Sequence, residues 1–170
     1  MKRTTILALV TGALAVAPAA FCQSTDTGST TLDITVGPEA SLTVGTGTTT
    51  LSASDTKFGD RTGTTNFTYK IRTTQSGGTG SITVKVTAFA ANGPAVSDLS
   101  YTCTVAASGT GCSSSTVAST SAGTNVASFG QDAHSSDAGD SGSVSWTLLD
   151  KTAVKTGNYT STATFTISAS

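Results

Sequence analysis

The sequence predicts an all-β protein, a single antiparallel, immunoglobulin-like β-sandwich of about seven to eight strands. Three observations indicate this fold. Apolar residues alternate with Thr or Ser in several short stretches, clusters of Gly, Ser, Asn and Pro separate those stretches, and no stretch of useful length has the period of an amphipathic helix. Hydrophobic residues make up 36% of the chain, which is enough for a folded core although only 11% of residues are charged. A closed barrel is the alternative architecture.

The first residues have the order of a secretory signal peptide. Lys2 and Arg3 precede an apolar run over residues 6–20, with small residues at its end. The run is shorter than the about 20 apolar residues that a membrane-spanning helix needs. We therefore expect an exported protein of the periplasm, cell surface or extracellular space, with no transmembrane segment after cleavage.

Two cleavage positions satisfy the small-x-small rule, one after Ala19 and one after Cys22. We expect cleavage after Cys22, which makes residues 1–22 the signal peptide and residues 23–170 the β-sandwich domain. A lipoprotein would need a small residue directly before the cysteine, and Phe21 stands there.

Several stretches have the alternation of a strand. In chain order they are residues 31–36, 41–44, 67–73, 81–89, 99–105, 143–149 and 158–170. In the first of them Leu32, Ile34 and Val36 alternate with Asp33 and Thr35. We expect this stretch to pair within its own domain as an ordinary first strand.

The strands at 67–73 and 81–89 are joined by "TQSGGTG", residues 74–80. Its glycines can adopt the positive φ that a tight connection demands. We therefore expect these two strands to form a hairpin.

The last predicted strand has the longest alternation, with Thr or Ser on one face and mostly apolar residues on the other. Its Thr-rich face could suggest ice binding, but Lys, Arg and Asp interrupt the pattern on other strands, so ordinary strand propensity explains it better.

Trp146, the single tryptophan, alternates with Val144 and Leu148. We expect it in the core, as in many sandwich domains, rather than exposed for stacking on sugar rings.

Cys103 and Cys112 flank the turn-like sequence "TVAASGTG". In an exported protein such a pair predicts a structural disulfide that closes this loop. Two thiolates of a closed zinc site are the alternative, but that site needs four ligands, and the chain has one His and no further Cys close by.

The letters "GDSG", residues 139–142, resemble the surroundings of the nucleophile in trypsin-like serine proteases, and His134 lies six residues before Ser141. A serine nucleophile needs a base held within hydrogen-bond reach and a third group that orients the base. Here both residues lie in one connection rich in Gly, Ser and Asp, which indicates a turn. We therefore expect no enzyme and no catalytic residue.

Asp132, Asp137 and Asp140 lie in the same connection and could gather around a calcium ion, which prefers oxygen ligands. Their spacing matches no dedicated calcium loop, so a solvated surface loop is favoured and no cofactor is expected.

The chain has 9 Lys and Arg against 10 Asp and Glu and no basic cluster. This composition argues against a nucleic-acid partner.

The C-terminal stretch from Gly142 to Ser170 resembles the closing hairpin of small secreted bacterial sandwich proteins, among them spore coat protein U-like proteins and chaperone–usher pilins. The resemblance is carried by Gly157, Tyr159 and the alternating last strand. "WTL" at residues 146–148 also resembles the WxL cell-wall domains. Both resemblances imply an extracellular sandwich.

From these features we expect an exported, non-enzymatic structural or adhesive protein of the bacterial cell envelope or surface. The pilin-type resemblance implies a partner, the chain itself or another envelope protein, bound by β-strand pairing, with residues 29–36 completing a neighbouring subunit. The alternative is a secreted ligand-binding module, for calcium or carbohydrate, that uses the loop at residues 130–142.

Overall fold

The computed structural model describes residues 26–54 and 57–170. The predicted signal peptide and both of its cleavage positions lie outside the described residues. The chain divides into two units, Met1–Ile34 and Thr35–Ser170. The described part of the first unit contains no regular secondary structure and is exposed, and the described strands all lie in the second.

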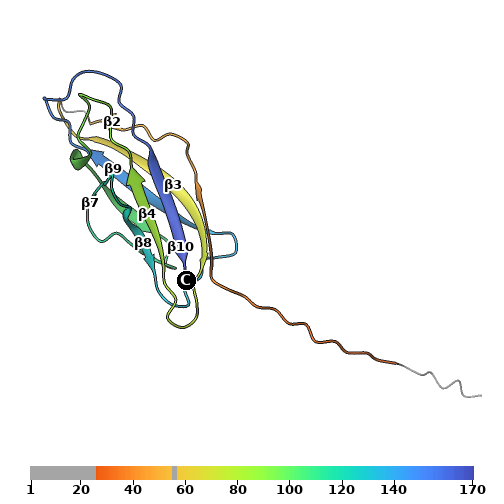
Figure 1. Ribbon diagram of the computed structural model, residues 1–170. Helices are drawn as coiled ribbons and strands as arrows, with labels where there is room; N and C mark the ends of the chain where they lie inside the picture. The colour runs from red at the N-terminus through yellow and green to blue at the C-terminus, as the bar shows by residue number, and fades with distance from the viewer. Residues whose placement is uncertain (1–25, 55–56) are drawn as a thin grey trace, which may run out of the picture. The chain divides into compact units, whose positions relative to one another are not determined.

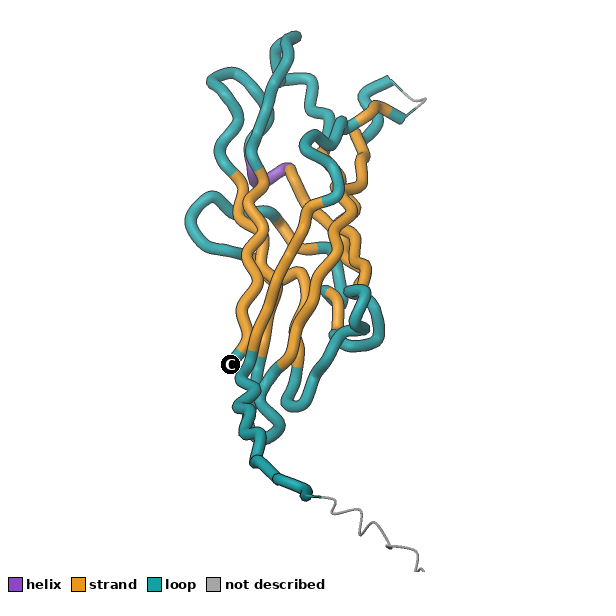
Figure 2. Tube along the Cα trace, turned by 90° about the vertical axis from the view of Figure 1, so that its right-hand side faces the viewer, coloured by secondary structure: helices purple, strands orange, loops and turns teal. Residues whose placement is uncertain are grey.

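The second unit is built from two antiparallel sheets that pack face to face (Figures 1 and 2). The elements of the described residues are β1 (Glu39–Val44), β2 (Ser52–Ala53), β3 (Arg61–Arg72), β4 (Gly80–Val86), the 3₁₀ helix η1 (Val96–Asp98), β5 (Leu99–Val105), β6 (Thr110–Gly111), β7 (Thr116–Val117), β8 (Thr124–Phe129), β9 (Asp140–Leu148) and β10 (Ala163–Ala169). One sheet has the order β1-β3-β9-β5-β7, with β2 also on β3, and the other has the order β10-β4-β8-β6. The described residues form no helix long enough to cross a bilayer.

Alternation along the strands places one face of each sheet in a shared core. On β3, buried Phe67, Tyr69 and Ile71 alternate with exposed Thr68 and Lys70. The core also contains side chains of β4, β5, β8 and β9, namely Ile82, Val84, Val86, Leu99, Tyr101, Val126, Ala127, Phe129, Val144, Trp146 and Leu148. The predicted all-β sandwich is therefore confirmed and the barrel is not observed, while the immunoglobulin-like character stays a prediction.

The predicted hairpin between residues 67–73 and 81–89 is wrong. β3 belongs to the six-stranded sheet and β4 to the four-stranded sheet, so residues 74–80 connect the two sheets. The glycines still allow the chain to turn sharply. Gly77 has a φ of +74°, which favours glycine, and a Cβ at Gly78 would overlap the backbone of Thr74. The local signal for a turn was correct, but a turn does not specify which strands pair.

The closing hairpin implied by the resemblance is also absent, because β9 and β10 lie in different sheets. β10 begins at Ala163, later than the predicted start at residue 158. Before it, the Tyr159 hydroxyl bonds the carbonyl oxygens of Asn92 (3.1 Å) and Lys155 (2.9 Å). These contacts hold this part of the alternating stretch in a loop.

β8 has no counterpart among the predicted strands. Its pairing with β4 shifts register between Ile82 and Thr83, and Val126 and Ala127, which are consecutive, are both buried. A bulge of this kind breaks the two-residue period on which strand prediction depends.

The predicted first strand at residues 31–36 is wrong as well. The described chain is extended there but has no strand, and Leu32, Ile34 and Val36 are 89%, 87% and 57% exposed. Alternating apolar side chains normally indicate a strand with one buried face, but here the apolar side chains are exposed to solvent.

Candidate functional site

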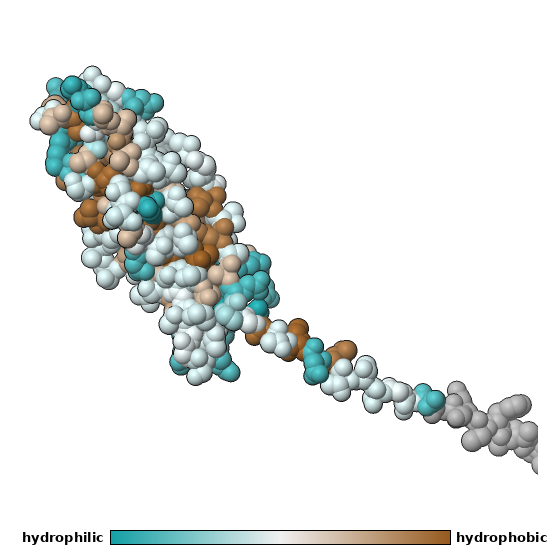
Figure 3. Space-filling view, viewed as in Figure 1, coloured by the Kyte–Doolittle hydropathy of each residue, from teal (hydrophilic) through white to brown (hydrophobic). Residues whose placement is uncertain are grey.

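One side of the sandwich, which we call the open edge, is formed by β1 of the six-stranded sheet and β10 of the four-stranded sheet. Each is the last strand of its sheet among the described residues, and the two strands contact each other. Phe165 and Ile167 on the inner face of β10 are only partly buried, whereas Ile82 and Val84 on the neighbouring β4 are 0% and 1% exposed. The core is therefore incompletely covered at this edge, and Figure 3 shows brown apolar surface over and beside β10.

A hollow of about 670 Å³ opens at one end of this edge. Buried Trp146 and Leu148 contribute to its floor. Val44, Phe58 and Leu149 line it and are 40%, 65% and 44% exposed. Large apolar side chains with this exposure form an exposed apolar patch, which is typical of a binding surface.

Trp146 confirms the expectation of a core residue, since it is only 5% exposed. Its Nε1–H donates to the Thr65 hydroxyl at 2.9 Å, and its ring meets that of Tyr101 edge-on with centroids 5.3 Å apart. The hydrogen bond to Thr65 and the contact with Tyr101 hold the indole ring in one orientation, so Trp146 forms a rigid part of the floor of the hollow.

Ion pairs hold the segment that follows β9 and forms one wall of the hollow. Arg61 pairs with Asp150 at 3.0 Å, and Lys151 pairs with Asp98 at 2.6 Å. The Asp98 side chain is 9% exposed, so the lysine contact compensates a nearly buried carboxylate. The charged side chains that line the hollow are three cations, Arg61, Lys151 and Lys155, and one acid, Asp150.

The leading segment, residues 29–36, displays the other exposed apolar side chains. The large hydrophobic residues exposed in the described chain are Leu32, Ile34, Val36, Val44, Phe58, Val117 and Leu149. Three of them lie on the leading segment and three line the hollow, while Val117 lies on β7. Exposed apolar surface is therefore concentrated in two places.

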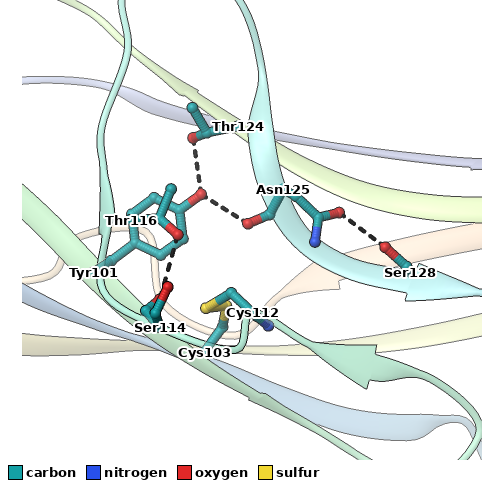
Figure 4. Close-up of a disulfide and its surroundings, with 8 residues drawn as sticks. All are labelled: Tyr101, Cys103, Cys112, Ser114, Thr116, Thr124, Asn125 and Ser128. Atoms are coloured by element: carbon teal, nitrogen blue, oxygen red, sulfur yellow. Dashed lines mark hydrogen bonds between the residues drawn. A yellow bond between two sulfur atoms is a disulfide. The ribbon is translucent and has the colours of Figure 1, made fainter.

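The opposite side of the sandwich, which we call the stapled edge, is formed by β5, β6 and β7. Cys103 and Cys112 form a disulfide there, with Cα atoms 5.3 Å apart, which confirms the predicted pair (Figure 4). Cys103 lies on β5 of the six-stranded sheet, and Cys112 directly follows β6 of the four-stranded sheet. The disulfide therefore joins the two sheets, a role that the sequence did not indicate.

Tyr101 makes a second link between the sheets at the stapled edge. It lies on β5, and its hydroxyl contacts the Thr124 hydroxyl (2.8 Å) and the Asn125 carbonyl oxygen (2.9 Å) of β8 (Figure 4). Burial raises the pKa of the Tyr101 phenol, and the hydrogen bond with Thr124 opposes this.

The three aspartates of the predicted loop are not brought together. Asp140 accepts hydrogen bonds from the Ser108 hydroxyl (2.5 Å) and the Ser136 amide (3.1 Å), and the contact with Ser108 lowers the pKa of its carboxyl. Asp132 lies 3.9 Å from Nδ1 of His134, and Asp137 is exposed. In the described part of the chain no three His, Cys, Asp or Glu side chains are placed to hold a metal ion. Calcium binding by this loop stays a prediction.

His134 and Ser141 belong to different surroundings. The backbone of His134 bridges that of Arg72, and its ring lies near Asp132. Ser141 lies on β9 opposite Thr68 and is exposed. The "GDSG" letters are thus the start of a paired strand, and the expectation of a non-enzyme stays a prediction.

No family model matches this chain. No curated protein and no solved structure matches it either.

Proposed function

We propose that this chain is an exported, non-enzymatic structural or adhesive protein of the bacterial envelope that assembles by β-strand pairing. In this proposal the leading segment of one copy binds at the open edge of another. One observation carries it, the concentration of exposed apolar side chains on the leading segment and around the hollow.

Strand pairing would satisfy both the backbone and the side chains at the open edge. An edge strand presents N–H and C=O groups that another extended chain can bond, and alternate side chains of the added strand can enter the core. Leu32, Ile34 and Val36 have that alternation, and fully burying one such side chain contributes about 1.5–3 kcal/mol. This gain offsets the entropy lost when the segment becomes ordered.

Charge also favours this partner. The leading segment carries Asp33 and no cation, whereas the hollow is lined by three cations and one acid. Opposite charges at an interface speed encounter and select the partner, and salt screens them. We expect assembly to slow as the ionic strength rises.

Size-exclusion chromatography with light scattering and electron microscopy on residues 23–170 tests the proposal. Oligomers or fibres are expected to increase with protein concentration and to disappear in the double variant Leu32→Ser/Ile34→Ser. The matched control is Thr31→Ser/Thr35→Ser, which changes the other face of the same segment and should assemble like the parent. A chain that stays monomeric at every concentration would contradict the proposal.

A further inference from the structure

The outer face of the six-stranded sheet brings together polar side chains that are distant in sequence. Strand register places Ser143 of β9 between Thr104 of β5 and Asn66 of β3 in one row. In the next row Ser141 lies opposite Thr68. The result is a field of hydroxyl groups and one amide drawn from three strands.

These five side chains line a shallow depression of about 460 Å³, which we call the polar depression. Gly45 and Gly142 also line it, with backbone atoms alone. Gly142 cannot be replaced without a shift, because a Cβ there would overlap the ring of Phe67. Gly142 therefore faces the core, and the ring of Phe67 packs against the backbone of β9 behind the depression.

The side chains of the polar depression form no hydrogen bond with any other described residue. By contrast, Thr64 and Ser145, on the same face one row away, contact each other with hydroxyl oxygens 3.5 Å apart. No charged residue lines the depression. It therefore presents donors and acceptors to solvent in a neutral setting.

We propose that the polar depression binds a neutral saccharide. Hydroxyls and an amide can both donate to and accept from sugar hydroxyls, and the absence of charge gives no advantage to an ionic ligand. Among the described residues that line the depression Phe67 is the only aromatic one, and its ring lies within the core, so recognition would rest on hydrogen bonds. Recognition by a few exposed hydrogen bonds predicts dissociation constants in the millimolar range. This inference goes beyond the proposed function, because it assigns a ligand to a surface that strand pairing at the open edge does not use.

An NMR titration of the ¹⁵N-labelled chain, residues 23–170, tests this inference with cellotriose and chitotriose at millimolar concentrations. At least one of the two probes is expected to cause saturable shifts that centre on the amides of Asn66, Thr104 and Ser143. The double variant Asn66→Ala/Ser143→Ala should bind that probe at least tenfold more weakly. The matched control Thr62→Ala, on the same face outside the depression, should bind like the parent.

The titration is run on the Leu32→Ser/Ile34→Ser variant as well, so that failure of assembly and failure of sugar binding are read separately. Absence of saturable shifts with both probes would overturn the inference. So would shifts centred on the hollow, or binding that survives in the Asn66→Ala/Ser143→Ala variant. A spectrum of each variant without sugar reports whether it is folded.

Discussion

The two edges of this sandwich close its core by different means. At the stapled edge a disulfide and the Tyr101 hydroxyl join the sheets, and Ser108, within the loop that the disulfide closes, bonds both Asp140 and Tyr69. At the open edge β1 and β10 meet beside a hollow, and the adjoining wall is held by ion pairs. The sheets are therefore linked covalently at one edge, and it is at the other edge that we propose a partner binds.

The largest expected difference between the edges comes from a matched pair of phenylalanines. Phe129 on β8 is 4% exposed and packs on Tyr69 with ring centroids 5.3 Å apart, whereas Phe165 on β10 is partly buried and packs on Phe67 at 5.8 Å. Phe129→Ala should lower the free energy of unfolding by about 3–5 kcal/mol. Phe165→Ala should lower it by about 1–2 kcal/mol, because part of that ring is already in water. Urea unfolding measures both, and equal losses would contradict the distinction between the edges.

Removing the disulfide tests the stapled edge directly. The double variant Cys103→Ala/Cys112→Ala should lose about 2–3 kcal/mol, because a short cross-linked loop restricts the unfolded chain. Thermal unfolding with and without reductant checks this. Reductant should lower the melting temperature of the parent and leave that of the variant unchanged. If reduction does not affect the parent, the disulfide does not hold this edge.

A smaller effect is expected at the wall of the hollow. Lys151→Ala leaves the nearly buried carboxylate of Asp98 without its cation, and we expect a loss of about 1 kcal/mol, since the lysine itself is largely exposed. Lys155→Ala is the matched control, because Lys155 has no ion pair among the described residues, and it should change stability by no more than about 0.5 kcal/mol. Denaturant unfolding in low and high salt separates the two. An equal response to salt in both variants would show that the Lys151 pair contributes nothing.

The smallest predicted effect concerns the Asp140 carboxyl, whose pKa the Ser108 hydroxyl lowers. A lowered pKa in the folded state means that this contact stabilises the protein above the ordinary carboxyl pKa and stops doing so as the pH falls through the lowered value. Ser108→Ala should therefore raise the pKa of Asp140 toward its ordinary value. A carbon-13 NMR titration of the carboxyl measures it, and an unchanged pKa would show that another group causes the shift.

Much of the strand content could be predicted from residue patterns. The stretch at 99–105 coincides with β5, and the stretches at 41–44, 67–73, 81–89 and 143–149 fall mainly on β1, β3, β4 and β9. Alternation works there because each of these strands buries one face. It fails at β8, where a bulge buries consecutive residues, and at Leu32 and Ile34, where the alternating face is exposed.

Residue patterns predict less of the candidate sites. The spacing of Cys103 and Cys112 predicts their disulfide but does not indicate that it joins the two sheets. The hollow combines residues as distant as Val44 and Leu149, and the polar depression combines Thr104 with Asn66. No local pattern signals such combinations, because they follow from the pairing of strands far apart in the chain.

By itself the sequence determined that this is a β protein with a disulfide, which residues face inward on most strands, and that Trp146 belongs to the core. Only the tertiary structure decided which strands share a sheet, that residues 74–80 cross between sheets, and that one edge is linked while the other is open. The physical reason is that apolar side chains tend to be buried and polar ones exposed, so the residue pattern along a strand indicates which face is buried. Backbone hydrogen bonds between strands, by contrast, are chemically alike at every position and carry no local record of their partner.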